Sequence, residues 1–394
     1  MKTRKLILPA LLCSALSVYA LEPSRYWISE TPSAATDAFS VYEAGRDESS
    51  PRIQVALLLD TSNSMDGLIE QAKSRLWHII NTLTTLKYRG KEPVIEISLY
   101  EYGNTGLGEP SDYIRQVLPL TRDLDLLSSK LFSLTTYGGE EYCGQVISNA
   151  VSQLKWSDTK ADMKLIYIAG NEPFDQGRYS YQEAISEARR DNIYINTIYC
   201  GSRDAGISEL WYEGARLGKG KYFNIDSDKK VRFIATPYDD RIAECNKRLN
   251  ETYISYGAEG ESKKINQEVQ DINASKISAS NYAERALTKS KSKHYNNSSW
   301  DLVDRAKDDP DYLAHVDNDE LPAELKGKSE SEIRRYIDKM EKERTAIQNE
   351  MSELGKKRQT YIDEQMKNAT DEDDLGNAIT SSIIELANVK GYRQ

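Results

Sequence analysis

Residues 54–65 read Gln-Val-Ala-Leu-Leu-Leu-Asp-Thr-Ser-Asn-Ser-Met, an apolar run that ends abruptly in polar side chains. An unbroken apolar run of this length is typical of a strand buried in a parallel sheet. The polar turn is followed by apolar residues at helical spacing, namely Leu68, Ala72, Leu76, Ile79, Ile80 and Leu83. The stretch therefore predicts a buried strand, a tight turn and an amphipathic helix.

Three oxygen-bearing side chains alternate just beyond this strand: Asp60, Ser62 and Ser64. Open α/β sheets bind ligands at the carboxyl ends of their strands. Carboxylate and hydroxyl oxygens suit Mg²⁺, Mn²⁺ or Ca²⁺ better than zinc or copper. We therefore interpret the three residues as a candidate divalent-cation site. The alternative is a helix N-terminus whose hydroxyls only cap free backbone N–H groups.

The chain from residue 51 to about residue 228 alternates between expected strands and helices. Strands are predicted at 54–59, 94–102, 113–118, 163–169, 193–200 and 221–225. Helices are predicted near 68–86, 124–134, 143–154, 181–190 and 207–217. The second and third strands are close enough along the chain to form an antiparallel hairpin. The pattern predicts a doubly wound, mostly parallel six-stranded sheet with an antiparallel edge.

The signature Asp60-x-Ser62-x-Ser64, in this order of elements, resembles the von Willebrand factor type A (VWA) domain. The resemblance covers about residues 51–228 and implies a Rossmann-like sheet with a metal-ion-dependent adhesion site (MIDAS), where a cation binds a partner. The fragments 170–174, 198–201 and 221–226 also resemble exported bacterial VWA proteins of unassigned role. We therefore expect a bound divalent cation, Mg²⁺ first, with Mn²⁺ or Ca²⁺ as alternatives.

In the resembling family, a threonine on the loop before the helix near Cys143 completes the coordination. Here Glu140 follows Gly138-Gly139 at that position. We expect Glu140 to be a ligand, with Thr135, Thr136 and Glu141 as substitutes. The alternative is that Glu140 and Glu141 are first-turn acids that favour the helix dipole.

The family's later aspartate is missing from this chain. Gly170 stands at its position, so Asn171 or Glu172 would have to reach the site directly or through water. A cation held by both Asp60 and Glu140 would be more fully neutralised than one held by a single carboxylate and hydroxyls. Binding of an acidic ligand therefore cannot simply be carried over from adhesive relatives.

The first twenty residues predict a secretory signal peptide. Basic residues precede an apolar core at 6–16, and Val18-Tyr19-Ala20 forms a small-x-small cleavage site, so we expect cleavage after Ala20. The chain has a formal charge of −10, which argues against nucleic acid or anionic membrane as the main partner. Nothing downstream approaches the roughly 18 to 20 apolar residues that a membrane helix needs. We expect a soluble protein of the periplasm or the medium.

Cys143, Cys200 and Cys245 would remain after processing. We expect a disulfide between Cys143 and Cys200, because both loops should open on the ligand-bearing edge and export permits oxidation. The alternative is two buried free cysteines. None of the three histidines has another histidine or a cysteine at the spacing of metal ligands. A histidine-rich zinc site is therefore not expected.

The remaining chain divides into a low-order leader at 21–50, a VWA-associated helix and strand at 229–260, and a helical, partly coiled-coil extension at 261–394. Beyond Pro322, apolar residues recur near four-three spacing: Ile333, Ile337, Met340, Ile347, Met351, Leu354 and Tyr361. Arg344 and Arg358 interrupt this seam and weaken the case for a parallel dimer.

The sequence thus favours a non-enzymatic, exported protein that binds another protein through a cation. The alternative is an envelope scaffold that interacts through its C-terminal helices, with a structural or absent metal. A metal-assisted hydrolase using Asp60, Glu140 and Glu172 lacks a recognisable base and nucleophile.

Overall fold

The computed structural model describes residues 50–366 and 375–394. The predicted signal peptide and all but the last residue of the leader lie outside the described residues. None of the described helices is long and apolar enough to cross a membrane.

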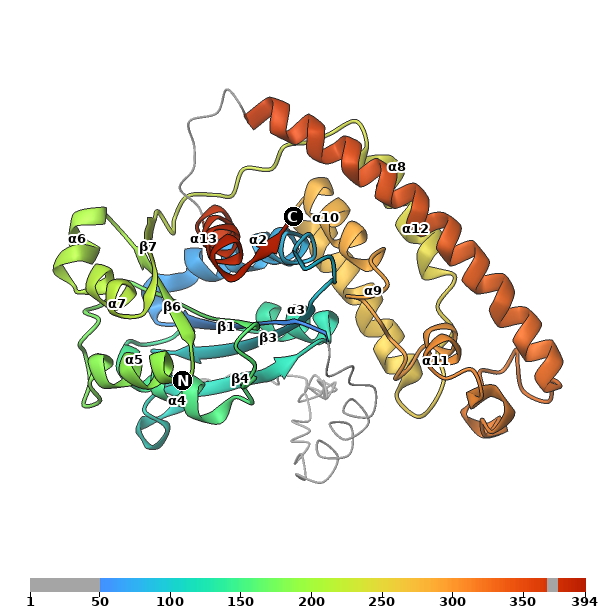
Figure 1. Ribbon diagram of the computed structural model, residues 1–394, viewed down its shortest axis with the longest axis horizontal. Helices are drawn as coiled ribbons and strands as arrows, with labels where there is room; N and C mark the ends of the chain where they lie inside the picture. The colour runs from blue at the N-terminus through green and yellow to red at the C-terminus, as the bar shows by residue number, and fades with distance from the viewer. Residues whose placement is uncertain (1–49, 367–374) are drawn as a thin grey trace, which may run out of the picture. The chain divides into compact units, whose positions relative to one another are not determined.

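A six-stranded sheet forms the centre of the fold (Figure 1). Its strands are β1 (Arg52–Asp60), β3 (Val94–Tyr102), β4 (Ile114–Thr121), β5 (Met163–Gly170), β6 (Ile193–Cys200) and β7 (Lys219–Ile225). They lie in the order β4-β3-β1-β5-β6-β7, and only the β3–β4 pair is antiparallel. The mostly parallel sheet with an antiparallel edge is confirmed.

Strand β1 lies at the middle of the sheet and is buried from Ile53 to Asp60. Val55, Leu57 and Leu59 pack on one face, and Ala56 and Leu58 pack on the other. This two-sided burial explains why the run is apolar without alternation. The register pairs Asp60 with Tyr102, so the carboxyl ends of β1 and β3 coincide.

Helices cover both faces of the sheet (Figure 1). One face carries α2 (Asp66–Leu83) and α3 (Leu124–Phe132). The other carries α4 (Cys143–Gln153), α5 (Tyr181–Arg190) and α7 (Trp211–Leu217). The helix expected at 207–217 is split into α6 (Arg203–Ser208) and α7, because Leu210 adopts a left-handed backbone with φ of 66°.

The rest of the chain is mostly helical and shares the core of the sheet. It comprises α8 (Asp239–Asn250), α9 (Gly260–Ile277), α10 (Ala279–Lys289), α11 (Leu302–Asp308), α12 (Glu330–Met366) and α13 (Leu375–Lys390). Side chains of α8, α10, α12 and α13 belong to the same buried cluster as those of β1 and α2. The strand expected within residues 229–260 is reduced to one β-bridge between Ser255 and Asp301.

The C-terminus returns to the sheet domain. Strand β8 (Tyr392–Arg393) pairs antiparallel with β2 (Lys87–Tyr88). The hydroxyl of Tyr392 donates to the carbonyl oxygens of Arg52, at 3.0 Å, and Ala161, at 3.2 Å. The last helix and strand are therefore bound to the first strand by packing and by hydrogen bonds.

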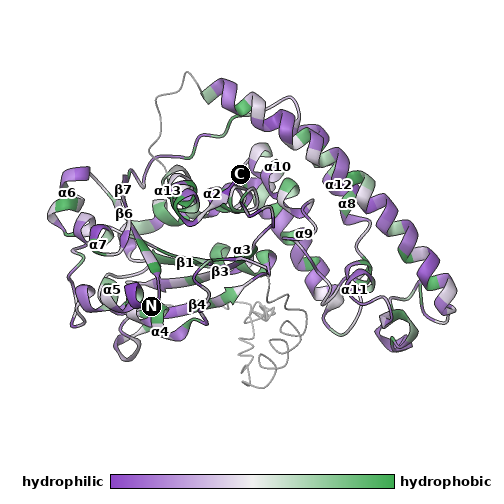
Figure 2. Ribbon diagram, viewed as in Figure 1, coloured by the Kyte–Doolittle hydropathy of each residue, from purple (hydrophilic) through white to green (hydrophobic). Residues whose placement is uncertain are grey.

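The apolar seam of α12 is covered by the chain's own helices. Ile333, Ile337 and Met340 pack in a cluster with Leu302 and Leu313. Figure 2 shows α12 as mostly hydrophilic, with hydrophobic residues recurring along it. The pattern that suggested coiled-coil character is thus satisfied by packing within one chain.

The two seam arginines form buried ion pairs instead of interrupting the packing. Arg344 lies 2.6 Å from Asp301 and 2.8 Å from Asp304, and its guanidinium lies 4.2 Å from the centre of the Tyr253 ring. Arg358 lies 2.9 Å from Asp239. The arginines therefore join α12 to the preceding helices.

The structure contradicts the expected disulfide. Cys143, Cys200 and Cys245 are free and buried in the described chain. Cys143 packs in the cluster on the α4 face of the sheet, whereas Cys200 packs in the cluster on the α2 face. Both residues lie near the carboxyl edge, as expected, but the sheet separates their sulfur atoms.

Candidate functional site

The site is centred on Asp60, the last residue of β1, which is fully buried. Its Oδ1 accepts a hydrogen bond of 2.7 Å from the backbone N–H of Ser62. Its Oδ2 is buried without any hydrogen-bond partner. A buried carboxylate oxygen without a partner is costly, so this atom is set up to bind something that is not part of the chain.

The serine hydroxyls lie beside Asp60 and do not cap a helix. Ser62 precedes the 3₁₀ turn Asn63–Met65, and its side chain forms no capping hydrogen bond. Its Oγ lies 3.2 Å from Oγ of Ser64. Asn171, which follows β5, donates from Nδ2 to Oγ of Ser64 at 3.2 Å. The structure therefore brings the predicted Ser62, Ser64 and Asn171 together and argues against the capping alternative.

Glu141, and not Glu140, faces Asp60. Glu141 is 5% exposed. A Cβ built on Gly103 would lie 2.7 Å from Oδ1 of Asp60 and 2.9 Å from Cγ of Glu141, so both acids border the same glycine. Glu140 is partly exposed and accepts a hydrogen bond of 3.1 Å from the Tyr142 hydroxyl. The sequence predicted an acidic ligand on this loop, with Glu140 first and Glu141 as a substitute, and the burial of Glu141 favours the substitute.

The two threonines form hydrogen bonds to residues other than Asp60. The hydroxyl of Thr136 hydrogen-bonds Asp66 at the start of α2. Thr135 is exposed, and its carbonyl oxygen accepts from Asn104 at 3.0 Å. Both threonines thus stabilise the loop that carries Glu141.

Glu172 supplies a third carboxylate near the site. Its carbonyl oxygen accepts a hydrogen bond of 2.8 Å from the indole of Trp211, which anchors the loop after β5. Its negative charge raises the pKa values of both Asp60 and Glu141. The sequence indicated this residue as an alternative to Asn171 at the position of the missing aspartate.

Burial and mutual repulsion disfavour the ionised forms of the carboxyl groups at the site. Burial, with the nearby charges of Glu141 and Glu172, raises the pKa of Asp60 to about 8. Burial, then the charge of Glu172, raises the pKa of Glu141 to about 7. Among the described residues, no lysine or arginine forms an ion pair with Asp60, Glu141 or Glu172. A cation would relieve this repulsion.

The donor set fits a hard divalent cation. Asp60 and Glu141 offer carboxylate oxygens, Ser62 and Ser64 offer hydroxyls, and Asn171 offers an amide oxygen. In the described part of the chain, no three Asp, Glu, His or Cys side chains converge into a metal cluster by themselves. Hydroxyl, amide or water oxygens would therefore have to complete the coordination.

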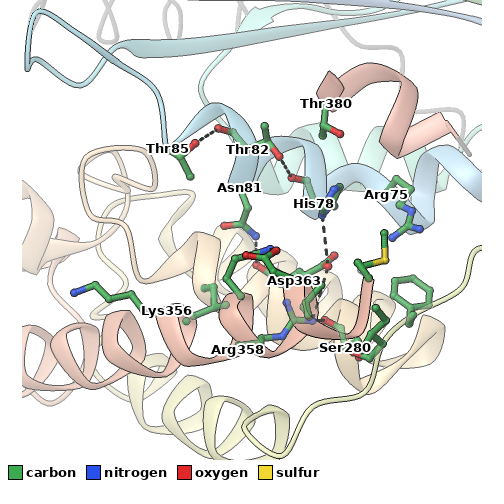
Figure 3. Close-up of a pocket in the computed structure, with 18 of the residues that line it drawn as sticks. Arg75, His78, Asn81, Thr82, Thr85, Ser280, Lys356, Arg358, Asp363 and Thr380 are labelled. Carbon is green, nitrogen blue, oxygen red and sulfur yellow. Dashed lines mark hydrogen bonds and ion pairs between the residues drawn. The ribbon is translucent and has the colours of Figure 1, made fainter. Parts of the chain in front are cut away.

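A cavity of about 980 Å³ lies elsewhere, between α2, α10, α12 and α13. Figure 3 shows Arg75, His78 and Asn81 of α2 facing Ser280 and Arg358. His78 lies 3.8 Å from Glu284, which also lies 3.8 Å from Arg358. None of the cation ligands predicted from the sequence lines this cavity.

The family comparison agrees with the fold. The model of the von Willebrand factor type A domain matches residues 54–235. The chain contains a VWA domain. The match begins two residues after the start of β1 and ends beyond β7, so it includes Asp60, Glu141 and Glu172.

Several solved structures are similar to the VWA domain of this chain. BatB from Bacteroides thetaiotaomicron is 16% identical, with a TM-score of 0.34, and the match covers 44% of this chain and 90% of that one. The VWA domain of SpRpn10 is 19% identical, with a TM-score of 0.33, and the match covers 44% and 88%. Proximal thread matrix protein 1 from the mussel byssus, with a zinc-occupied MIDAS motif, is 14% identical, with a TM-score of 0.35, covering 46% and 43%. A comparison with curated proteins found no match.

Proposed function

We propose that this protein is an exported, non-enzymatic binding protein whose VWA domain holds a divalent cation, Mg²⁺ in the first place, and uses it to bind a partner protein. The observation that carries the proposal is the buried Oδ2 of Asp60, which has no hydrogen-bond partner at the carboxyl edge of the sheet. Two further carboxylates without a basic partner stand beside it. When bound, Mg²⁺ would offer water-occupied positions that a partner's oxygen can replace.

The chain's own residues supply the rigidity that such a site needs. The position of Asp60 is fixed because β3 and β5 pair with β1 along nearly the whole length of β1. Ser62 and Ser64 follow on a 3₁₀ turn that leads directly into α2. Asp60, Ser62 and Ser64 therefore lie at the end of a strand and on the short turn that leads into a helix, which favours binding with little reorganisation.

Calorimetry on the chain without its first 20 residues tests the cation. The chelator-treated protein should bind Mg²⁺ or Mn²⁺, and Asp60→Ala should abolish the binding while the circular dichroism spectrum stays folded. Asp338→Ala, an exposed acid on α12, is the matched control and should bind as the parent does. Equal binding by Asp60→Ala would refute the site.

Partner capture then tests the use of the cation. Material retained from a cell-envelope extract with Mg²⁺ should be released by EDTA and should not be retained by Asp60→Ala. Deletion of the C-terminal helices is unsuitable as a test because these helices share the core of the sheet. Fractionation and N-terminal sequencing of the expressed protein test export and cleavage after Ala20.

A further inference from the structure

The loops around the cation site carry far more acidic than basic side chains. These loops are residues 61–66, 103–113, 136–142, 171–180 and 201–210, which lie at the carboxyl edge of the sheet. Besides Glu141, their acids are Asp66, Glu109, Asp112, Glu140, Glu172, Asp175, Asp204 and Glu209. Their basic residues are Arg178 and Arg203. The segment after β7 is balanced, with Asp226 and Asp228 beside Lys229 and Lys230.

The two arginines do not neutralise the centre of this face. Arg178 is 3.6 Å from Glu109, and both side chains are largely exposed. The guanidinium of Arg203 lies 5.7 Å from the centre of the Tyr222 ring. Neither arginine forms an ion pair with Asp60, Glu141 or Glu172 in the described structure. The acidic excess therefore remains around the site itself.

Two tyrosines and one glutamate form a rim beside the cation site. The ring centres of Tyr113 and Tyr142 are 6.0 Å apart in an edge-to-face arrangement. Tyr142 donates its hydroxyl hydrogen to Glu140, and its ring packs on Gly177, where an added Cβ would lie 2.8 Å from the ring. Tyr137, on the same loop as Glu140, is 62% exposed. Aromatic faces next to a carboxylate suit a guanidinium or ammonium group.

We propose that the partner presents a basic segment to this face, with an arginine or lysine side chain packed against Tyr113 and Tyr142 and paired with Glu140. This inference rests on the proposed function, since it concerns the same binding face, and it adds the chemistry of the partner. A neutral oxygen of the same segment, a hydroxyl or a carbonyl, would approach the unpartnered Oδ2 of Asp60 through the cation.

An acidic partner fits this face poorly. A ligand carboxylate would approach Asp60, Glu141 and Glu172 together, and like charges across an interface are unfavourable. Even with a bound divalent cation, these three acids and the outer acids leave the face negative. The negative field of the face attracts a basic segment during the encounter, and the ion pair with Glu140 stabilises the segment once it is bound.

Peptide binding to the full chain without its first 20 residues tests the inference. The probes are three pools of short acetylated peptides of random sequence, in which two adjacent central positions are fixed as Arg-Arg, Gln-Gln or Glu-Glu. In Mg²⁺ and low salt, the Arg-Arg pool should bind at least about fivefold more than the Glu-Glu pool. Glu140→Gln and Tyr142→Ala should each reduce that binding about threefold.

Two variants separate local recognition from general attraction to an acidic protein. Glu353→Gln removes an exposed acid of α12, far along the chain from the rim, and should leave Arg-Arg binding unchanged. Tyr142→Phe keeps the ring but releases the hydrogen bond to Glu140, so it should retain more binding than Tyr142→Ala. Equal loss in Glu353→Gln and Glu140→Gln would overturn the inference.

The remaining outcomes distinguish this inference from the proposed function. Equal or stronger binding of the Glu-Glu pool, or no retention of any pool, overturns the basic partner while Mg²⁺ binding by calorimetry can still stand. An Arg-Arg preference that is unchanged in EDTA supports the basic partner and removes the cation from the proposed function.

Discussion

Gly170 packs directly against Asp60. A Cβ built on Gly170 would lie 3.0 Å from Oδ2 of Asp60 and 2.5 Å from the hydroxyl oxygen of Tyr102. That hydroxyl in turn donates to the carbonyl oxygen of Ala169 at 2.9 Å. No side chain fits at this position, so the aspartate expected from the family resemblance is replaced by close packing around the Asp60 carboxylate.

Gly170→Ala should therefore damage the site from within the core. The added methyl group must displace Asp60 or Tyr102, and overpacking of this kind costs about 1 to 3 kcal/mol of unfolding free energy. Chemical denaturation measures the loss, and Mg²⁺ titration should show weaker binding. Gly355→Ala on α12 is the control, because its Cβ would meet only the flexible end of Leu287. Equal stability of the two variants would contradict the packing argument.

The sequence could predict the sheet, and the polar side chains that follow its first strand, because both depend on local pattern. The strand of residues 54–59 is buried on both faces, so its composition alone reveals it, and its end fixes Asp60, Ser62 and Ser64. Glu141 could not be separated from Glu140, because the backbone before it depends on contacts from another loop. Gly138 has a φ of 73°, and an added Cβ there would lie 1.8 Å from Oγ1 of Thr105.

The pairing of the C-terminus with the sheet domain could not be predicted from the sequence either. Tyr392 bonds a carbonyl 340 positions earlier in the chain, and no local pattern records such a contact. Likewise, an arginine at a seam position of a helix predicts a break in the apolar packing if its distant acidic partner is not known. Asp301, the partner of Arg344, precedes it by 43 residues.

The cysteine arrangement predicts the outcome of thiol titration. Denatured, unreduced protein lacking residues 1–20 should show a reactive thiol for each of Cys143, Cys200 and Cys245. In the native protein all three should react slowly, because burial raises the pKa of each thiol and hides it from the reagent. A single reactive thiol after denaturation, together with a mapped peptide that links Cys143 to Cys200, would restore the disulfide between them.

Replacement of Arg344 should loosen α12. Arg344→Met leaves Asp301 and Asp304 buried without their cation, and breaking a buried pair in this way costs about 3 to 5 kcal/mol. Thermal or denaturant unfolding measures the loss. Arg335→Met, at an exposed position of the same helix, should change stability by less than about 0.5 kcal/mol. Similar losses in both variants would show that the ion pairs are not the cause.

His294 should make the protein sensitive to mild acid. Burial lowers the pKa of His294 from 6.5 to about 4. The negative charge of Glu92 opposes this shift, and the positive charges of three basic neighbours add to it, namely Lys291, Arg122 and Lys293. The unfolded chain then binds a proton between pH 6.5 and 4 that the folded chain does not. Stability therefore falls as pH falls through this window, by up to about 3 kcal/mol.

Denaturant titrations at several pH values check this slope. His294→Gln should flatten it, whereas His315→Gln, at an exposed site, should not. An unchanged slope in His294→Gln would assign the acid sensitivity to other groups.

The last prediction concerns the two adjacent glutamates. Glu141 borders Asp60 and is buried, so Glu141→Gln should weaken Mg²⁺ binding by about tenfold or more, because one carboxylate ligand is lost. Glu140 accepts from the Tyr142 hydroxyl, so Glu140→Gln should leave Mg²⁺ affinity within about threefold of the parent.

A second measurement separates loss of a ligand from general damage. Without metal, burial and the charge of Glu172 raise the pKa of Glu141 in the folded chain from 4.5 to about 7. At pH 8 the ionised Glu141 therefore lowers the stability of the folded state. Glu141→Gln should therefore bind Mg²⁺ more weakly and yet be more stable than the parent in EDTA at pH 8. Weaker binding with lower stability would indicate structural damage, and a larger effect from Glu140→Gln would restore Glu140 as the ligand.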